Sequence, residues 1–330
     1  MTGVVAAGRV ALCAGLAALC GLPAACGSPP KADGSEGAAA ASAPIAVGGA
    51  IDRPGSLSLA ELRAVPAVTQ TVRYGMGAAP KRRTFTGADL WSLLESRGIQ
   101  TDAAVEADVL RKYVVATGSD GYRAAFSLGE LKPDFGNRGS LVAYAELVDG
   151  ARVALKGDEV RVTAPGDVRS GRYVSSLVRL DVRASVSTKR AAGGGASTRF
   201  EVSGAVLRPT TFDLAALQAL PAIERRIGTS IYRGVTLWNL LGAAGFVLDP
   251  KVKGDVLGRY VVSTGSDGYQ ALFALGELDP GFGAQPNLVA YEVDGAAVGA
   301  RGFARLVVPN DARRGRWVAN LVSLEVFAAP

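Results

Sequence analysis

The alternation of hydrophobic and polar positions follows the same course twice along the chain. The stretches YVVATGSDGYRAAFSLGEL at 113–131 and YVVSTGSDGYQALFALGEL at 260–278 are identical at fifteen of nineteen positions. In both, an apolar run rich in β-branched residues precedes Gly-Ser-Asp-Gly, and a second apolar run follows. Such runs favour strands, and Gly-Ser-Asp-Gly is typical of a tight turn. Each stretch therefore predicts a β-hairpin.

Similar elements are predicted around both hairpins. Upstream, the pattern predicts a strand and then a short helix, at 46–51 and 57–62 in the first copy and at 201–206 and 212–217 in the second. Downstream, further strands are predicted at 141–144, 159–164 and 177–183, and at 288–291, 303–308 and 321–327. This mixture predicts an α+β fold that is rich in strands.

A longer helix is predicted between the first strand and the hairpin of each copy. Asp89 and Thr236 are favourable N-cap residues, and Gly98 and Gly245 lie where helices commonly end. Between these limits leucines recur at helical spacing. They are Leu90, Leu93 and Leu94 in the first copy, and Leu237, Leu240 and Leu241 in the second.

The repeat predicts two tandem domains. We place the first copy at 45–184 and the second at 200–330, with a Gly-rich linker at 185–199. A repeat of this length is typical of duplicated domains, because the repeats of solenoids are about 20–50 residues long. Each copy is long enough to bury a core of its own.

The N-terminal segment predicts export. Residues 1–26 combine an early arginine with an apolar run of signal-peptide length, and residues 27–44 form a low-complexity flexible tether. The run ends in Leu-Pro-Ala-Ala-Cys, which resembles a bacterial lipoprotein signal with Cys26 as the lipidated residue. Ordinary cleavage a little further on is the alternative. The expected location is the periplasm or, through a lipid anchor, the membrane surface of a bacterium.

Composition narrows the possible chemistry. The chain is 48% hydrophobic and therefore not a disordered protein, and it contains no histidine. Its three cysteines are Cys13, Cys20 and Cys26, so the body beyond them has neither a thiolate nor an imidazole for a metal or a nucleophile. The net charge is +6 without a long basic run, which favours a solvated surface over nucleic-acid binding.

The second copy carries an ordered set of motifs. It reads GVTLWNLL at 234–241, SDGY at 266–269, LVAYEVDG at 288–295, ARLVVP at 304–309 and RGRWV at 314–318. This order resembles the molybdopterin-binding domain of sulfite oxidase-type oxidoreductases, and the first copy resembles it more weakly. The resemblance implies that fold in two tandem copies, with molybdopterin as cofactor and an oxidoreductase role.

One departure from the family changes this expectation. The family holds its molybdenum partly through a cysteine upstream of the GVxL helix, and the corresponding stretches, 72–86 and 225–234, contain no cysteine. A thiolate is the soft ligand that completes such a site. We therefore expect no metal ligand in either copy, and the sequence identifies no catalytic residue.

The resemblance also suggests cofactor-binding residues. Six arginines pair between the copies and match the family's "vRlvvPg" strand or the loop that holds the pterin phosphate. They are Arg161, Arg169, Arg172, Arg305, Arg313 and Arg316. Guanidinium groups suit phosphate because their planar donors engage its oxygens in pairs. The alternative is that these arginines cap strand ends or lie in a solvated loop. Asp120 and Asp267 of the hairpins are better explained as turn residues than as acids or bases.

Two functions remain. The first is an exported relative of molybdopterin-dependent oxidoreductases that lacks cysteine-ligated molybdenum. The second is a non-catalytic envelope module on the same scaffold, with a small anionic ligand or an envelope protein as its partner. Neither involves nucleic acid.

Overall fold

The computed structural model describes residues 43–75, 80–189 and 193–330, except for the side chain of Asp158. The chain from Ala41 to Pro330 forms one compact unit. The predicted signal peptide at 1–26, with Cys26, and most of the tether at 27–44 lie outside the described residues. No helix in the described part of the chain is long and apolar enough to cross a membrane.

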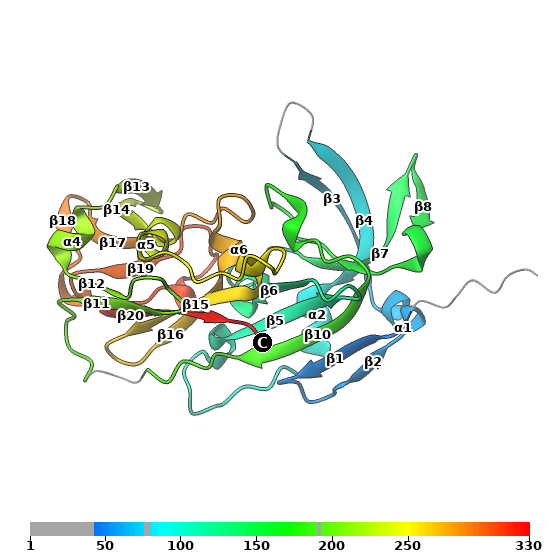
Figure 1. Cartoon of the computed structure of the whole chain (residues 1–330), viewed down its shortest axis with the longest axis horizontal. Helices are drawn as coiled ribbons and strands as arrows, with labels where there is room; N and C mark the ends of the chain where they lie inside the picture. Colours follow the sequence, from blue (N-terminus) through cyan, green and yellow to red (C-terminus); the bar gives the residue numbers. More distant parts are fainter. Residues whose placement is uncertain (1–42, 76–79, 190–192) are drawn as a thin grey trace, which may run out of the picture. The chain divides into compact units, whose positions relative to one another are not determined.

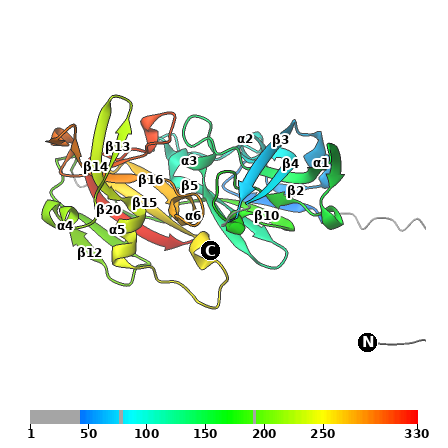
Figure 2. The ribbon, with the colours of Figure 1, turned by 90° about the horizontal axis from the view of Figure 1, so that it is seen from above.

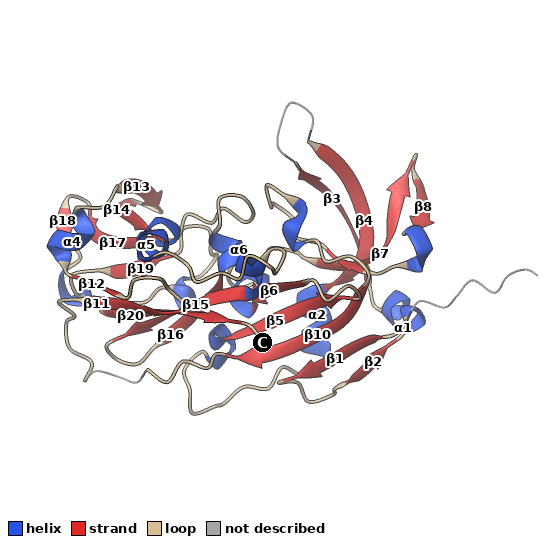
Figure 3. Ribbon diagram, in the orientation of Figure 1, coloured by secondary structure: helices blue, strands red, loops and turns tan. Residues whose placement is uncertain are grey.

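Two similar pairs of sheets build the described chain (Figures 1 and 3). In the first pair, one sheet has the order β2 (Gly55–Leu57), β1 (Ile45–Gly49), β10 (Leu177–Ala184), β5 (Lys112–Gly118) and β6 (Arg123–Ser127). The other contains β3 (Ala67–Tyr74), β4 (Lys81–Asp89), β7 (Leu141–Val148) and β8 (Ala151–Ala154), with β9 (Arg161–Val162) paired to β7. Strands β1 and β10 are parallel, and the other pairs are antiparallel.

The second pair repeats this topology. Its first sheet has the order β12 (Thr210–Phe212), β11 (Phe200–Gly204), β20 (Leu321–Ala328), β15 (Arg259–Gly265) and β16 (Gln270–Ala274). Its second contains β13 (Ile223–Ile227), β14 (Ser230–Thr236), β17 (Leu288–Val293) and β18 (Ala296–Ala297), with β19 (Arg305–Val307) paired to β17. The prediction of a strand-rich mixed fold in two similar parts is confirmed at this level. The limits of the copies and linker stay predictions.

Short helices connect the strands. The α-helices are α1 (Leu59–Ala64), α2 (Leu90–Ser96), α3 (Leu128–Leu131), α4 (Leu214–Gln218), α5 (Leu237–Ala244) and α6 (Leu275–Leu278). The 3-10 helices are η1 (Asp108–Arg111), η2 (Lys156–Asp158), η3 (Ser170–Arg172), η4 (Asp255–Gly258), η5 (Gly299–Arg301) and η6 (Arg314–Arg316).

The predicted caps of the longer helices are confirmed. The side chain of Asp89 accepts a hydrogen bond from the Ser92 amide at 2.8 Å, and that of Thr236 accepts one from the Asn239 amide at 3.2 Å. Beyond α2, Gly98 has a φ of 78°, which favours glycine. Local side-chain chemistry thus sets the limits of α2 and α5.

Each copy has its own apolar core, and a third apolar cluster joins them. This cluster consists of Tyr113, Val115 and Ala125 from β5 and β6, and Tyr260, Val262, Leu272 and Ala274 from β15 and β16. The ring centroids of Tyr113 and Tyr260 are 4.4 Å apart. Figure 2 shows β5, α3 and α6 in the region between the two parts. The repeated hairpins therefore pack against each other.

Candidate functional site

Arg172 lies in η3, and carboxylates surround its guanidinium group. Its Nε and Nη2 donate to Asp167 at 2.8 and 2.7 Å, and its Nη1 donates to both oxygens of Glu130 at 2.9 Å. The guanidinium carbon also lies 5.0 Å from the centre of the Phe126 ring. Since Arg172 is only 1% exposed, this is a buried ion-pair network.

Arg316 repeats the arrangement in η6. Its Nε donates to Asp311 at 2.7 Å, and its Nη1 donates to Glu277 at 2.6 Å. Phe273 takes the place of Phe126, with the guanidinium carbon 5.0 Å from its ring centre. Two arginines predicted to hold a pterin phosphate thus form bidentate ion pairs with protein carboxylates.

The two networks meet across the junction of the copies. Ser127 Oγ of the first copy donates to Glu277 Oε2 of the second at 2.9 Å. A Cβ at Gly276 in α6 would lie 2.6 Å from Arg172 Cδ, and a Cβ at Gly129 in α3 would overlap the stem of Arg316. In each repeated Leu-Gly-Glu-Leu, glutamate therefore binds the arginine of its own copy, and glycine leaves room for the arginine of the other.

The network contains more acids than bases. Four carboxyl groups, from Glu130, Asp167, Glu277 and Asp311, meet two guanidinium groups. Burial raises the pKa of Glu130 to about 7, with Arg172 opposing the shift and Glu277 adding to it. Burial also raises the pKa of Asp311 against the opposing effect of Arg316. A carboxyl group that faces another negative charge in an apolar setting binds its proton more tightly.

The remaining predicted arginines have different surroundings. Arg169 and Arg313 are exposed. The side chain of Arg313 is 73% exposed, and its Nη2 lies 3.4 Å from Asp134 of the first copy. Arg161 in β9 donates from Nη2 to Glu159, and to Ser175 Oγ at 2.8 Å.

Arg305 in β19 differs from its counterpart Arg161. Phe303 stands two residues before Arg305, where Glu159 stands two residues before Arg161. Arg305 is only 8% exposed, and its Nε, like that of Arg161, is buried without a hydrogen-bond partner. Across the described residues, no carboxylate forms an ion pair with it. The second copy therefore contains a buried cation without a counter-ion.

An aromatic ring and further cations surround Arg305. The guanidinium carbons of Arg305 and Arg314 each lie 4.9 Å from the centre of the Trp317 ring. Burial lowers the pKa of Arg305 to about 10, and the positive charges of Arg301 and Arg314 act in the same direction. Arg301 and Arg314 are exposed, so solvent reaches this positive cluster. We call Arg301, Arg305, Arg314 and Trp317 the arginine–tryptophan cluster.

The hairpin aspartates form local hydrogen bonds. Asp120 Oδ1 accepts from the Tyr122 amide at 3.0 Å, and Asp267 Oδ1 accepts from the Tyr269 amide at 2.9 Å. The Tyr122 hydroxyl donates to the carbonyl of Gly171 at 2.8 Å. These contacts agree with the interpretation of both aspartates as turn residues.

The side chains available do not suit a cysteine-ligated molybdenum centre. All three cysteines precede residue 27, and the chain has no histidine. Within 43–75, 80–189 and 193–330, no three acidic, cysteine or histidine side chains are grouped so that they could hold a metal ion. A cysteine-ligated metal needs a thiolate, and neither copy contains a cysteine or a histidine.

Sequence reasoning identified the arginines but missed most of their partners. It did not single out the buried glutamates, Glu130 and Glu277, or the arginine–tryptophan cluster around Arg305. The repeated Leu-Gly-Glu-Leu, and an aspartate five residues before both Arg172 and Arg316, were signals for the buried network. Binding of a pterin phosphate by the six arginines stays a prediction.

Comparisons with known proteins give distant structural likenesses. No family model and no curated protein matches the chain. Among solved structures, the sulfane dehydrogenase SoxCD from Paracoccus pantotrophus is similar, with a TM-score of 0.34 and 12% sequence identity over 86% of this chain and 77% of that chain. The likeness is too distant to assign the sulfite oxidase-type fold, a cofactor or an activity.

Proposed function

We propose that the protein is a non-catalytic binding module, and that the arginine–tryptophan cluster of its second copy binds a small oxyanion. One observation carries the proposal. Arg305 is 8% exposed and has no carboxylate partner in the described chain, whereas Glu159 pairs with its counterpart Arg161. A buried charge is costly unless it is paired and hydrogen-bonded. A bound anion supplies the missing counter-charge.

The chemistry of the cluster indicates the class of anion. A guanidinium group presents planar donors that match the oxygens of sulfate, phosphate and carboxylate groups. The buried Arg305 Nε supplies one free donor, and the exposed Arg314 can approach the same ligand from solvent. Trp317 restricts the space beside Arg305, because both guanidinium carbons lie 4.9 Å from its ring centre. This arrangement favours a small oxyanion.

Thermal unfolding with sodium sulfate or sodium phosphate, against sodium chloride at equal ionic strength, tests the proposal. A ligand at one hundred times its Kd stabilises the folded state by about 2.7 kcal/mol. We expect the anion-dependent rise in Tm for the wild type and for Arg161→Met, and its loss in Arg305→Met. Arg305→Met should unfold no more easily than the wild type without anion, because it removes an unpaired charge. Equal anion stabilisation of Arg305→Met and the wild type would refute the proposal.

In this proposal the protein is exported and has no catalytic activity. The apolar run within residues 1–26 and the cysteine at its end support secretion with lipid attachment at Cys26. The partner is then a small anion or an envelope protein rather than nucleic acid. We keep the sulfite oxidase-type scaffold as part of the proposal on the strength of the ordered motifs in the second copy. No molybdopterin chemistry follows, because neither copy has a thiolate for the metal. Mass spectrometry of the envelope fraction, with Cys26→Ser as the control, tests the acylation.

A further inference from the structure

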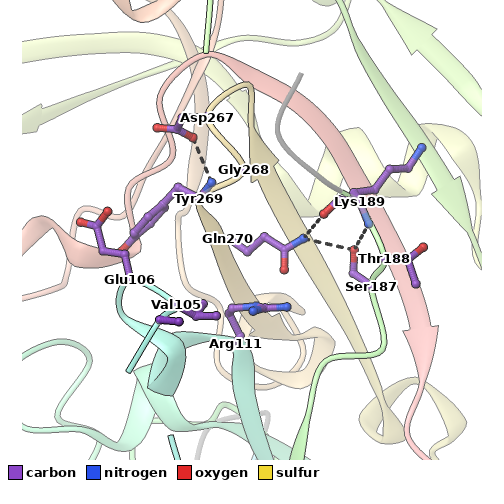
Figure 4. A pocket seen from close by; sticks show the side chains of 11 residues that line it. Val105, Glu106, Arg111, Ser187, Thr188, Lys189, Asp267, Gly268, Tyr269 and Gln270 are labelled. Carbon is purple, nitrogen blue, oxygen red and sulfur yellow. Dashed lines mark hydrogen bonds between the residues drawn. The ribbon is translucent and has the colours of Figure 1, made fainter. Parts of the chain in front are cut away.

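A cavity of about 490 Å³ lies beside the turn of the second hairpin. Its walls come from three segments: residues 104–106 with Arg111 of the first copy, residues 187–189 after β10, and residues 267–270 of the second copy. Figure 4 shows these side chains around one space. The proposed oxyanion site shares none of these residues, so the two sites can be tested separately.

Gln270 presents an unpartnered acceptor in the wall of this cavity. The residue is 3% exposed, and its Nε2 donates to the carbonyl oxygen of Lys189 at 3.2 Å. The hydroxyls of Ser187 and Thr264 lie 3.3 and 3.2 Å from the same nitrogen. Because a carbonyl oxygen can only accept, this contact fixes the orientation of the amide. Gln270 Oε1 is left buried without a donor.

Arg111 presents an unpartnered donor in the same cavity. Its Nε is buried and has no hydrogen-bond partner. The nearby Asp108 lies 3.7 Å from Arg111 Nη1 and forms a shorter ion pair with Lys112 at 2.9 Å. In Figure 4 the Arg111 side chain lies next to Gln270. A cationic donor and a neutral acceptor, both incompletely bonded, therefore line one space.

Acidic groups lie on another side of the cavity. Glu106 and Asp267 lie near Tyr269 on one side of Gln270, and Lys189 lies on the other side (Figure 4). Burial raises the pKa of the Tyr269 hydroxyl to about 12, and the negative charges of Glu106 and Asp267 add to the shift. Glu106 is exposed and has no ion-pair partner in the described chain. Lys189 is paired with Glu201 at 3.2 Å, so Arg111 supplies the positive charge of the cavity, and Glu106 and Asp267 supply the negative charge.

We propose that this cavity binds a short peptide-like zwitterion. The ligand's carboxylate lies against Arg111, an N–H group donates to Gln270 Oε1, and the ammonium group faces Glu106 and Asp267. This arrangement supplies the buried acceptor and the buried donor with partners and matches the charge at both sides of the space.

The equivalent cavity beside the first hairpin is a natural comparison. It has a volume of about 340 Å³ and is lined by Arg123, Lys253 and Gly258, among others. At the equivalent positions of the repeat, Arg123 corresponds to Gln270, Lys253 to Glu106 and Gly258 to Arg111. The buried acceptor, one acid and the arginine are therefore absent, and we expect no zwitterion to bind there.

Isothermal titration with glycylglycine tests the proposal on the intact folded chain. N-acetylglycine lacks the ammonium group, and glycinamide lacks the carboxylate. Each lost charged contact should weaken binding about tenfold or more relative to glycylglycine. Glycylglycine should bind with one site per chain. Failure of glycylglycine to bind, or equal binding of all three compounds, would overturn the proposal.

Matched variants locate the site. Arg111→Met and Glu106→Gln should each weaken glycylglycine binding about tenfold, whereas Lys253→Met in the equivalent cavity should leave it unchanged. Glu106 is exposed, so Glu106→Gln keeps the fold even where Arg111→Met lowers stability. Unchanged affinity in Glu106→Gln and Arg111→Met, or a loss in Lys253→Met, would place the ligand elsewhere. Arg305→Met should bind glycylglycine like the wild type, which separates this site from the oxyanion site.

Discussion

Replacing Arg172 with methionine tests the view that the predicted phosphate-binding arginines of η3 and η6 stabilise the junction of the copies. Methionine retains much of the apolar stem and removes five donors. The side chains of Glu130 and Asp167, 1% and 0% exposed, then lose their cationic partner. Breaking a buried ion pair by removing one partner costs about 3–5 kcal/mol, because an uncompensated charge is left behind. At about 2–4 °C per kcal/mol, Tm should fall by roughly 6–20 °C.

Urea unfolding followed by circular dichroism, together with calorimetry, measures this loss. The matched control is Arg313→Met, taken from the same predicted set. The Arg313 side chain is 73% exposed and has a single contact at 3.4 Å with Asp134, so its loss should cost no more than about 1 kcal/mol. Adding Glu130→Gln to Arg172→Met should restore part of the stability. The reasoning fails if Arg172→Met unfolds within 1 kcal/mol of the wild type, or if the control is equally destabilised.

Two further predictions concern the junction. Gly171→Ala would bring a Cβ into overlap with the Phe282 ring of the other copy and should cost about 1–3 kcal/mol. Gly258→Ala is the control, because nothing lies within 4 Å of the added atom, and it should leave Tm unchanged in thermal unfolding. An equal loss of stability in both variants would contradict close packing between Gly171 and Phe282. Folding raises the pKa of Glu130 from 4.5 to about 7, so the protonated form of Glu130 favours the folded state. Its contribution to the free energy of unfolding should be complete below pH 4.5 and should be lost as pH rises through 7. Glu130→Gln should flatten the pH profile of urea unfolding between these values, and an unchanged profile would exclude the effect.

Local signals in the sequence were sufficient for the hairpins and the longer helices. The apolar runs around Gly-Ser-Asp-Gly predicted β5–β6 and β15–β16, and the cap residue Asp89 marked the start of α2. The same reasoning missed β3 and β13, which carry many exposed polar residues and bury few side chains. It also missed α3 and α6, because four residues are too few for a helical period to show.

The candidate site could be predicted only in part, because the sequence does not show which distant side chain lies against an arginine, even where a nearby aspartate is a signal for one partner. Arg172 and Arg313 lie in equivalent loops and looked alike, yet one is enclosed by carboxylates and the other is 73% exposed. The difference depends on Glu130, which is forty-two residues away along the chain. For Arg305 the sequence did contain a signal, since Phe303 replaces the acid found at Glu159. Its meaning depended on knowing that Arg305 is buried.

The two copies carry the same residues in the buried arginine networks and differ where a ligand is proposed. At the junction, Gly129 and Gly276 each admit the arginine of the opposite copy, so the contact requires the same residues on both sides. The repeated stretch is therefore explained by mutual packing.

Replacements between the copies distinguish each proposed site from the equivalent place in the repeat. Phe303 stands where the first copy has Glu159, which leaves Arg305 without a counter-ion, and Gly258 stands where the first copy has Arg111. If these differences create the sites, sulfate and glycylglycine must each bind once per chain. Two equivalent sites for either ligand would mean that the divergence between the copies has no part in binding, and that the unpaired charge of Arg305 needs another explanation.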